Sequence, residues 1–139
     1  MRLSKKCDYA LRALCSLTES YEKEPTTIKD LADANDIPKR FLEHIMIEMK
    51  EKGWVRSVPG RYGGYMLAIH PSEITLGDVI RHFDDFLAPI GCVSVFKCNH
   101  CSQETTCKFR GVLSEIRNIT ARLADGTTLA SIVRSTKQL

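Results

Sequence analysis

The sequence contains no long apolar run. No segment reaches the ~18 consecutive apolar residues that a membrane-spanning helix needs. The N-terminus, MRLSKKCDYALRAL, begins with basic residues, but Asp8 and Arg12 interrupt the continuous apolar core that a signal peptide requires. These absences argue against a membrane protein and predict a soluble chain in the cytoplasm, without a membrane partner.

The sequence also lacks the common signatures of enzymes. We find no nucleotide-binding loop, no Ser-His-Asp order and no pair of carboxylates that stands out. Cys98-Asn-His-Cys101 has the C-x-x-C spacing of thiol oxidoreductases, but it does not follow a strand in a thioredoxin-like β-α-β pattern. We therefore expect a protein that is not an enzyme.

The composition is that of a globular protein with a local basic strip. The chain has 139 residues, 43% hydrophobic and 27% charged, which suits one domain or a small domain with an appendage. The net charge is only +3, but Lys52, Arg56 and Arg61 lie in a segment, residues 52–66, that has no acid. This strip is either a phosphate-contacting surface or a solvated basic turn.

Apolar periodicity predicts three helices in the first half of the chain. Residues 4–21 have helical spacing, Thr27 to Asp30 matches a capping box that opens a short second helix, and a third helix spans 39–52. The third helix has two faces. The inward stripe is Phe41, Leu42, Ile45, Met46 and Met49, and the outward face is Arg40, Glu43, His44 and Ile47.

Two short strands, 54–58 and 65–69, follow the third helix and enclose a glycine-rich loop. Another capping pattern opens a helix over 75–84. This order of elements predicts a winged helix-turn-helix, mostly α with a small β-hairpin, whose third helix is long enough to lie in a DNA major groove. A small domain that contacts proteins is the alternative.

The second half of the chain has a different organisation. Residues 85–107 have no clear periodicity, and a loop of this length is usually functional or disordered. Val112, Leu113, Ile116, Ile119 and Leu123 then predict a long amphipathic helix that starts near Cys107, and a short turn ends the chain. We predict a DNA-binding domain over 1–84, a cysteine-rich loop over 85–107, and a dimerisation helix with a C-terminal turn over 108–139.

Four of the six cysteines lie in the loop: Cys92, Cys98, Cys101 and Cys107. Their spacing, C-x5-C-x2-C-x5-C, supplies the thiolates that an iron–sulfur cluster or a zinc ion needs, whereas C-x-x-C alone would be a weak signal. We expect Cys107 to open a helix, where the helix dipole favours a thiolate. Cys7 and Cys15 lie beside the apolar stripe of the first helix and are expected to be packed.

The segment DIPKRFLEHIMIEMKEKGWVRSVPGRYGGYMLAIHPSEITLGDVI resembles the Rrf family of winged-helix transcription regulators, as do MRLSKKCDYALRAL and TTLASIV. The resemblance implies a homodimer, held mainly by the long C-terminal helix, on a pseudo-palindromic double-stranded DNA operator. The DNA contacts that it implies are Lys39, Arg40 and Glu43 of the third helix and Arg61, Gly63 and Gly64 of the wing. Pro59 stands where the family often has arginine, so Arg61 would take over the minor-groove contact. His44 faces outward, towards either DNA or solvent.

The resemblance also implies an iron–sulfur cluster, [2Fe–2S] or [4Fe–4S], held by three loop cysteines. Its spacing favours Cys92, Cys101 and Cys107, with Cys98 a close rival. The histidine that some members use is replaced by Arg110, and other members use an acidic residue of the partner subunit, which corresponds to Asp8. Ligation by all four loop cysteines is the alternative.

The sequence therefore predicts a homodimeric DNA-binding transcription regulator controlled by an iron–sulfur cluster that senses redox state, nitric oxide or iron. The alternative is a cluster-free or zinc-stabilised winged-helix regulator that acts through thiol oxidation or a protein partner.

Overall fold

The structure is a computed structural model that describes residues 2–84, 87–95 and 98–136. Of the predicted cysteine-rich loop, residues 85–86 and 96–97 lie outside the described residues, as do Met1 and the last three residues of the tail. In chain order the elements are α1 (Lys5–Glu19), α2 (Ile28–Asn35), α3 (Lys39–Glu51), β1 (Val55–Val58), β2 (Gly64–Leu67), η1 (Pro71–Glu73), α4 (Leu76–Asp84), η2 (Gly91–Val93), α5 (Arg110–Gly126) and α6 (Leu129–Thr136).

Local capping residues start two helices where the sequence predicts them. Thr27 Oγ1 accepts a hydrogen bond from the Asp30 amide (3.1 Å) and donates to the Asp30 carboxylate (2.7 Å), which satisfies a free N–H of α2. Thr75 Oγ1 accepts from the Asp78 amide in the same way (3.0 Å) and opens α4. Because these contacts span only three residues, the sequence alone specifies them.

The main core lies between α1, α2, α3 and the hairpin. The four inward residues Leu42, Ile45, Met46 and Met49 of α3 are fully buried, as the periodicity predicts. Phe41, predicted in the same stripe, is instead 41% exposed. Its ring meets the edge of Tyr9 at 5.5 Å, so Tyr9 occupies the inner position and leaves Phe41 at the rim of the core.

The hairpin forms the wing. β1 pairs with β2 antiparallel, from Val55 opposite Leu67 to Val58 opposite Gly64. On its other side, β2 exchanges two backbone hydrogen bonds between Tyr65 and Thr26, at 3.0 and 2.8 Å. The wing is therefore fixed to the segment that leads into α2.

The end of the chain differs from the prediction. The expected C-terminal turn is the helix α6, which packs against α1, and Leu129 is fully buried in the main core. Backbone hydrogen bonds from Leu76 to Thr127 (2.8 Å) and from Leu129 to Ile74 (3.0 Å) join this segment to the start of α4.

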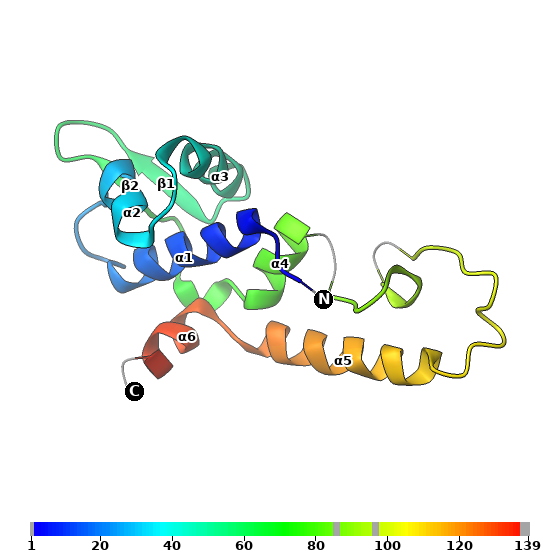
Figure 1. The fold of residues 1–139 in the computed structure, drawn as a ribbon. Coiled ribbons are helices and arrows are strands. Elements are labelled where there is room, and N and C mark those ends of the chain that lie inside the picture. Colours follow the sequence, from blue (N-terminus) through cyan, green and yellow to red (C-terminus); the bar gives the residue numbers. More distant parts are fainter. Residues whose placement is uncertain (1, 85–86, 96–97, 137–139) are drawn as a thin grey trace.

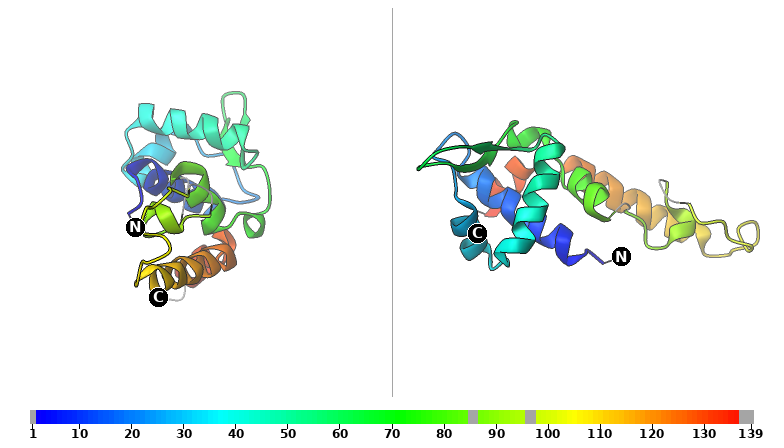
Figure 2. Two further views of the ribbon diagram at one scale, coloured as in Figure 1. Left: turned by 90° about the vertical axis from the view of Figure 1, so that its right-hand side faces the viewer. Right: turned by 90° about the horizontal axis from the view of Figure 1, so that it is seen from above.

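The elements form two ends of an elongated molecule. Figure 1 shows α3 and the wing on one side and α5 on the opposite side, with α1 and α4 between them. In Figure 2, α5 and the segment before it extend away from the winged helix. Among the described residues, no helix is both long enough and apolar enough to cross a membrane.

Candidate nucleic-acid interface and cysteine loop

The first candidate surface is the outward face of α3. Lys39, Arg40, Glu43 and His44 are all exposed, as predicted. Lys39 Nζ lies 3.9 Å from Glu43 Oε1, one helical turn along. The face therefore presents several hydrogen-bond donors to solvent, and the Glu43 carboxylate as an acceptor. Base edges in a DNA major groove offer matching acceptors and donors.

Contacts to neighbouring elements hold α3 in place. Lys6 of α1 forms an ion pair with Glu48, with Nζ 2.6 Å from Oε1. Lys50 Nζ donates a 2.8 Å hydrogen bond to the Ser57 hydroxyl of β1. Together with the buried stripe, these contacts fix the direction of α3 relative to both α1 and the wing.

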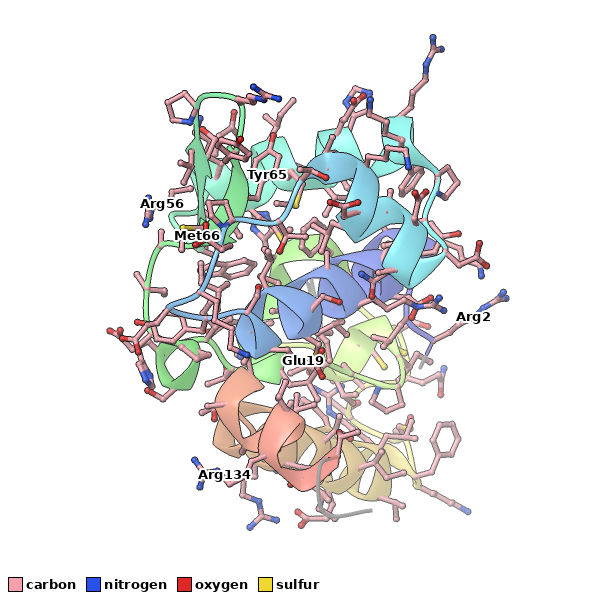
Figure 3. All side chains as sticks on the ribbon, turned by 90° about the vertical axis from the view of Figure 1, so that its left-hand side faces the viewer. Arg2, Glu19, Arg56, Tyr65, Met66 and Arg134 are labelled. Carbon is pink, nitrogen blue, oxygen red and sulfur yellow. The ribbon has the colours of Figure 1, made fainter. Side chains whose placement is uncertain are left out.

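The wing carries Arg61 in the exposed turn between β1 and β2. Gly64 permits the close approach of β2 to Thr26, because a Cβ on Gly64 would lie 2.3 Å from the Thr26 carbonyl oxygen. Figure 3 shows Arg56 and Met66 next to each other on the hairpin, where an Arg56 guanidinium N–H lies 3.3 Å from the Met66 sulfur. Arg61 thus lies in the exposed turn of the wing, whereas Arg56 lies near Tyr21 and Glu22, on the strand face opposite the Ser57 side chain that bonds to α3.

The second candidate site is the cysteine loop. All four loop cysteines are free thiols; Cys98 is exposed and the other three are partly exposed. Cys98 Sγ lies 3.6 Å from the carbonyl oxygen of Cys92, and the Asn99 amide donates to the Gly91 carbonyl (3.2 Å). The backbone therefore brings Cys92 and Cys98 near each other, a pairing that the sequence analysis ranked behind Cys92, Cys101 and Cys107.

The loop does not assemble a metal site by itself. Within residues 2–84, 87–95 and 98–136, no three His, Cys, Asp or Glu side chains gather closely enough to hold a metal ion. The donor chemistry nevertheless suits an iron–sulfur cluster, because four unpaired thiols lie on one segment.

Two details of the predicted ligand set differ from expectation. α5 begins at Arg110 with Phe109 as its N-cap, so Cys107 precedes the helix and does not open it. The reason is that residues 108 and 109 form a turn before the helical hydrogen bonds begin. Arg110, at the position where the resemblance would place histidine, is engaged in an ion pair with Glu104 at 2.8 Å.

Asp8 lies on α1, where the structure gives it a partner. Arg12 binds its carboxylate with two nitrogens, at 3.1 and 2.8 Å. Asp8 also lines an open surface pocket together with Asp84 and the residues that precede α1. No cysteine lines this pocket within the described part of the chain.

One hydrogen bond holds the end of α4 that precedes the loop, and another joins the loop itself to α5. Asp84, at the end of α4, accepts a 3.0 Å hydrogen bond from the Ser4 amide at the start of α1. Arg117 of α5 donates a 2.6 Å hydrogen bond to the Val93 carbonyl, beside Cys92. Sequence reasoning missed both residues, because each bond joins segments far apart in the chain and no local spacing indicates it.

An exposed apolar stripe follows α5. Its five members recur at intervals of three and four residues and are between 43% and 70% exposed: Phe109, Val112, Ile116, Ile119 and Leu123. Ala124 is the buried residue of this helix. The stripe has the spacing of a helix seam that packs against another helix.

Comparison with known proteins assigns the chain to a family. Residues 3–135 match the family model described as Rrf2, iron-dependent transcriptional regulator. The chain belongs to the Rrf2 family. Among its relatives in this family, the regulator NsrR of Geobacillus kaustophilus is 34% identical, over the whole of this chain and 94% of that protein.

The regulator CymR of Bacillus subtilis is another Rrf2-family relative, 32% identical over 98% of this chain and 92% of its own. The solved structure of CymR, described as the global cysteine regulator of that organism, superposes with a TM-score of 0.84 at 28% identity, covering 97% of this chain and 98% of that one. The winged helix-turn-helix prediction is thereby confirmed. The relatives are transcription regulators and not enzymes, which confirms that expectation too.

Proposed function

We propose that this Rrf2-family transcription regulator is a homodimer whose operator binding is controlled by an iron–sulfur cluster on the cysteine loop. The observation that carries the proposal is the placement of four free thiols on one segment, which the Arg117–Val93 hydrogen bond joins to α5. The signal would be redox state, nitric oxide or iron, in keeping with the family's description as iron-dependent.

The proposed DNA contacts lie on α3 and the wing. Lys39, Arg40, Glu43 and His44 would face the major groove, because they share the exposed face of a helix that projects from the core. In the wing, Arg61 would enter the adjacent minor groove, where its guanidinium meets a negative potential. Gly63 and Gly64 would allow the wing backbone to approach a phosphate.

The homodimer would form through α5. Its exposed apolar stripe is continuous over the helix and has no partner among the described residues of this chain. A second copy of the same helix offers the same seam, which makes a two-fold symmetric contact possible. Because α5 lies on the opposite side of the molecule from α3 (Figure 1), a dimer through α5 would leave both DNA-binding faces free.

The residues that would hold the cluster are Cys92, Cys98, Cys101 and Cys107, with Asp8 of the partner subunit as a further candidate. An iron–sulfur cluster supplies a centre that changes oxidation state or is lost on reaction, and so changes which thiols are held together. Asp8 would serve without leaving Arg12, because each of its oxygens accepts one hydrogen bond and keeps a further lone pair.

The chain's own contacts suggest how the loop acts on DNA binding. Val93, next to Cys92, is tied to Arg117 of α5, and Asp84, at the end of α4, is tied to Ser4, the N-cap of α1. A shift of the cysteine segment would therefore displace α5, which packs against α4, and α4 in turn packs against α1. Such a shift would change the spacing of the two recognition helices.

Anaerobic purification tests the proposal. The expected result is a coloured protein whose iron and acid-labile sulfide occur in matching amounts, and whose affinity for DNA changes when the cluster is removed. Single variants Cys92→Ser, Cys98→Ser, Cys101→Ser and Cys107→Ser would lower the iron content if they ligate, while Cys15→Ser is the matched control. A colourless protein after anaerobic reconstitution would overturn the cluster.

The second candidate is regulation without a cluster, through thiol oxidation, zinc or a protein partner. The similarity to CymR, described as a cysteine regulator, favours it, as does the proximity of Cys98 to Cys92. Zinc analysis and mass spectrometry of the oxidised loop distinguish these cases. Stoichiometric zinc, or a Cys92–Cys98 disulfide that alters DNA affinity in iron-free protein, would support this candidate.

A further inference from the structure

The tip of the wing exposes a tyrosine that no other part of the described chain covers. Tyr62 is 80% exposed, more than any other large apolar side chain in the described residues. A single exposed apolar residue is ordinary on a protein surface. Tyr62 differs because of its place, which is the turn of a projecting hairpin beside Arg61 (Figure 1).

The turn that presents Tyr62 is tightly defined. Gly60 has a φ of +108°, a conformation that other residues rarely adopt, and the Gly63 amide closes the turn on the Gly60 carbonyl at 3.1 Å. A Cβ on Gly63 would lie 2.0 Å from the Val58 carbonyl oxygen. The backbone is thus fixed on both sides of Arg61 and Tyr62, and these two side chains form the tip.

Arg61 and Tyr62 also contact each other. The Arg61 guanidinium lies 5.6 Å from the centre of the Tyr62 ring, within the range of a cation–π interaction. The pair therefore presents a positive charge and a flat apolar surface together. No acidic residue occurs from Lys52 to Met66, so nothing in the sequence of the wing neutralises this charge.

We propose that Tyr62 is a further DNA-contacting residue, whose ring packs against the sugars and base edges of the operator minor groove beside Arg61. The minor groove attracts arginine through its negative potential, and apolar side chains inserted there displace water and bend the duplex. Tyr62 supplies contact area while Arg61 supplies charge. This inference rests on the proposed DNA-binding face and adds a contact to it.

The test separates the two side chains by their salt dependence. The probe is a duplex of about 30 base pairs, which is enough for two half-sites. It is selected from a randomised library with the wild-type protein, once in its cluster-free form and once after anaerobic reconstitution. Tyr62→Ala should bind this duplex about tenfold more weakly with an unchanged salt slope, because it removes apolar contact and no charge. Tyr62→Phe should bind within about threefold of the wild type, since the ring remains.

Arg61→Ala serves as the comparison and should lower both the affinity and the salt slope, the latter by about 0.9, because one positive charge at the DNA is lost. Hydroxyl-radical footprinting adds a positional readout, because it reports the protection of individual sugars. Tyr62→Ala should lose protection at the sugars that the wing contacts and keep it elsewhere in the site. A circular dichroism melt of each variant checks that the fold is retained.

Each outcome distinguishes this inference from the proposed function. If the wild type enriches no duplex in either form, DNA control as proposed fails and the role of Tyr62 fails with it. If the wild type selects a duplex that folded Tyr62→Ala binds equally well, with the same footprint, only the role of Tyr62 is overturned. The wing tip would then be a surface for a protein partner.

Discussion

Cys7 lies in the first turn of α1, yet its side chain is fully buried. It packs with Ile80, Leu87 and Ala124 in a small second core where α1, α4, α5 and the start of the cysteine segment meet. Burial, together with the nearby carboxylate of Asp84, raises the pKa of the Cys7 thiol to about 12. The thiolate is the reactive form of cysteine, so Cys7 should be inert.

Alkylation should therefore spare Cys7. In cluster-free, reduced protein at about pH 8, a thiol with a pKa near 12 is roughly a thousandfold less ionised than an ordinary cysteine. Iodoacetamide labelling followed by peptide mass spectrometry should modify the exposed Cys98 rapidly and Cys7 only after unfolding in urea. Equal rates at Cys7 and Cys98 in the folded protein would contradict this packing.

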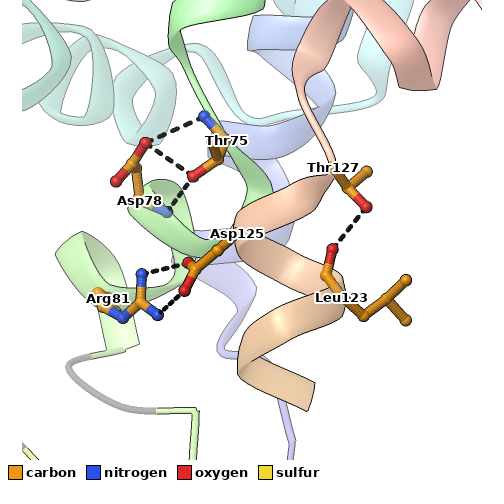
Figure 4. A network of polar contacts seen from close by, with 6 residues as sticks. All are labelled: Thr75, Asp78, Arg81, Leu123, Asp125 and Thr127. Carbon is orange, nitrogen blue, oxygen red and sulfur yellow. Dashed lines mark hydrogen bonds and ion pairs between the residues drawn. The ribbon is translucent and has the colours of Figure 1, made fainter. Parts of the chain in front are cut away.

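At the scale of elements, an ion pair reinforces the joint between α4 and α5, where Ile80 and Ala124 also share a buried cluster. Arg81 donates two hydrogen bonds to the Asp125 carboxylate, at 2.6 and 2.8 Å (Figure 4). Gly77 makes the approach possible, because a Cβ there would lie 2.1 Å from Asp125 Oδ1. The Thr127 hydroxyl donates to the Leu123 carbonyl (2.7 Å) and closes the end of α5 beside this pair.

Asp125→Asn should destabilise the protein in a pH-dependent way. The hydrogen bonds from Arg81 hold the pKa of Asp125 below its ordinary value of 3.8. The unfolded chain therefore takes up the proton first, so the contribution is complete above about pH 4 and is lost as the pH falls through the folded pKa. Since about half of the Asp125 side chain is exposed, we expect only ~0.5–1 kcal/mol at pH 7.

Urea unfolding of wild type and Asp125→Asn at fixed protein concentration, between about pH 3 and 7, measures this difference. Asp33→Asn is the matched control, because Asp33 pairs with Lys29 on the exposed face of α2 and should matter less. A difference that persists unchanged at the lowest pH would show that the Asp125 charge is not its cause. Gly77→Ala should weaken the same joint without changing any charge.

The elements also show what a sequence can specify. The caps at Thr27 and Thr75 involve residues three positions apart, and the buried stripe of α3 follows helical periodicity, so both were predictable. α6 was expected to be a turn, because the surface that stabilises its short helix belongs to α1, more than a hundred residues earlier. The exposure of Phe41 likewise depends on Tyr9, a non-local contact.

The candidate sites likewise contain some features that the sequence predicts and others that it does not. The outward face of α3 follows from its spacing, and the loop cysteines were found by counting. The attachments through Asp84 and Arg117 could not be predicted, because they depend on how distant segments pack. The proposed site would also include a cluster and a second subunit. No local sequence pattern shows how these would lie relative to the cysteines.

On the scale of the whole molecule, α3, with the proposed DNA contacts, and α5, with the apolar stripe, lie on opposite sides (Figure 2). This separation would let α3 bind DNA while α5 binds a second copy, as proposed. α1 and α4 lie between α3 and α5, and they carry the Asp84 and Arg81 contacts. A mutation at the stripe should therefore disrupt the proposed dimer without unfolding the winged helix.

Ile119→Asp should convert the proposed dimer into monomers. Ile119 lies within the exposed stripe, and burying a carboxylate in an apolar helix seam costs more than the seam contributes at that position. Light scattering after size exclusion should give twice the 15.7 kDa chain mass for the wild type and a single chain for the variant. Arg122→Gln changes the net charge equally at a neighbouring exposed position outside the stripe, and should remain dimeric.

The monomer should keep its helical circular dichroism but bind a two-half-site duplex far more weakly, since one winged helix contacts only one half-site. A wild type that is monomeric at all concentrations, or an Ile119→Asp variant that stays dimeric, would place the subunit contact elsewhere or remove it.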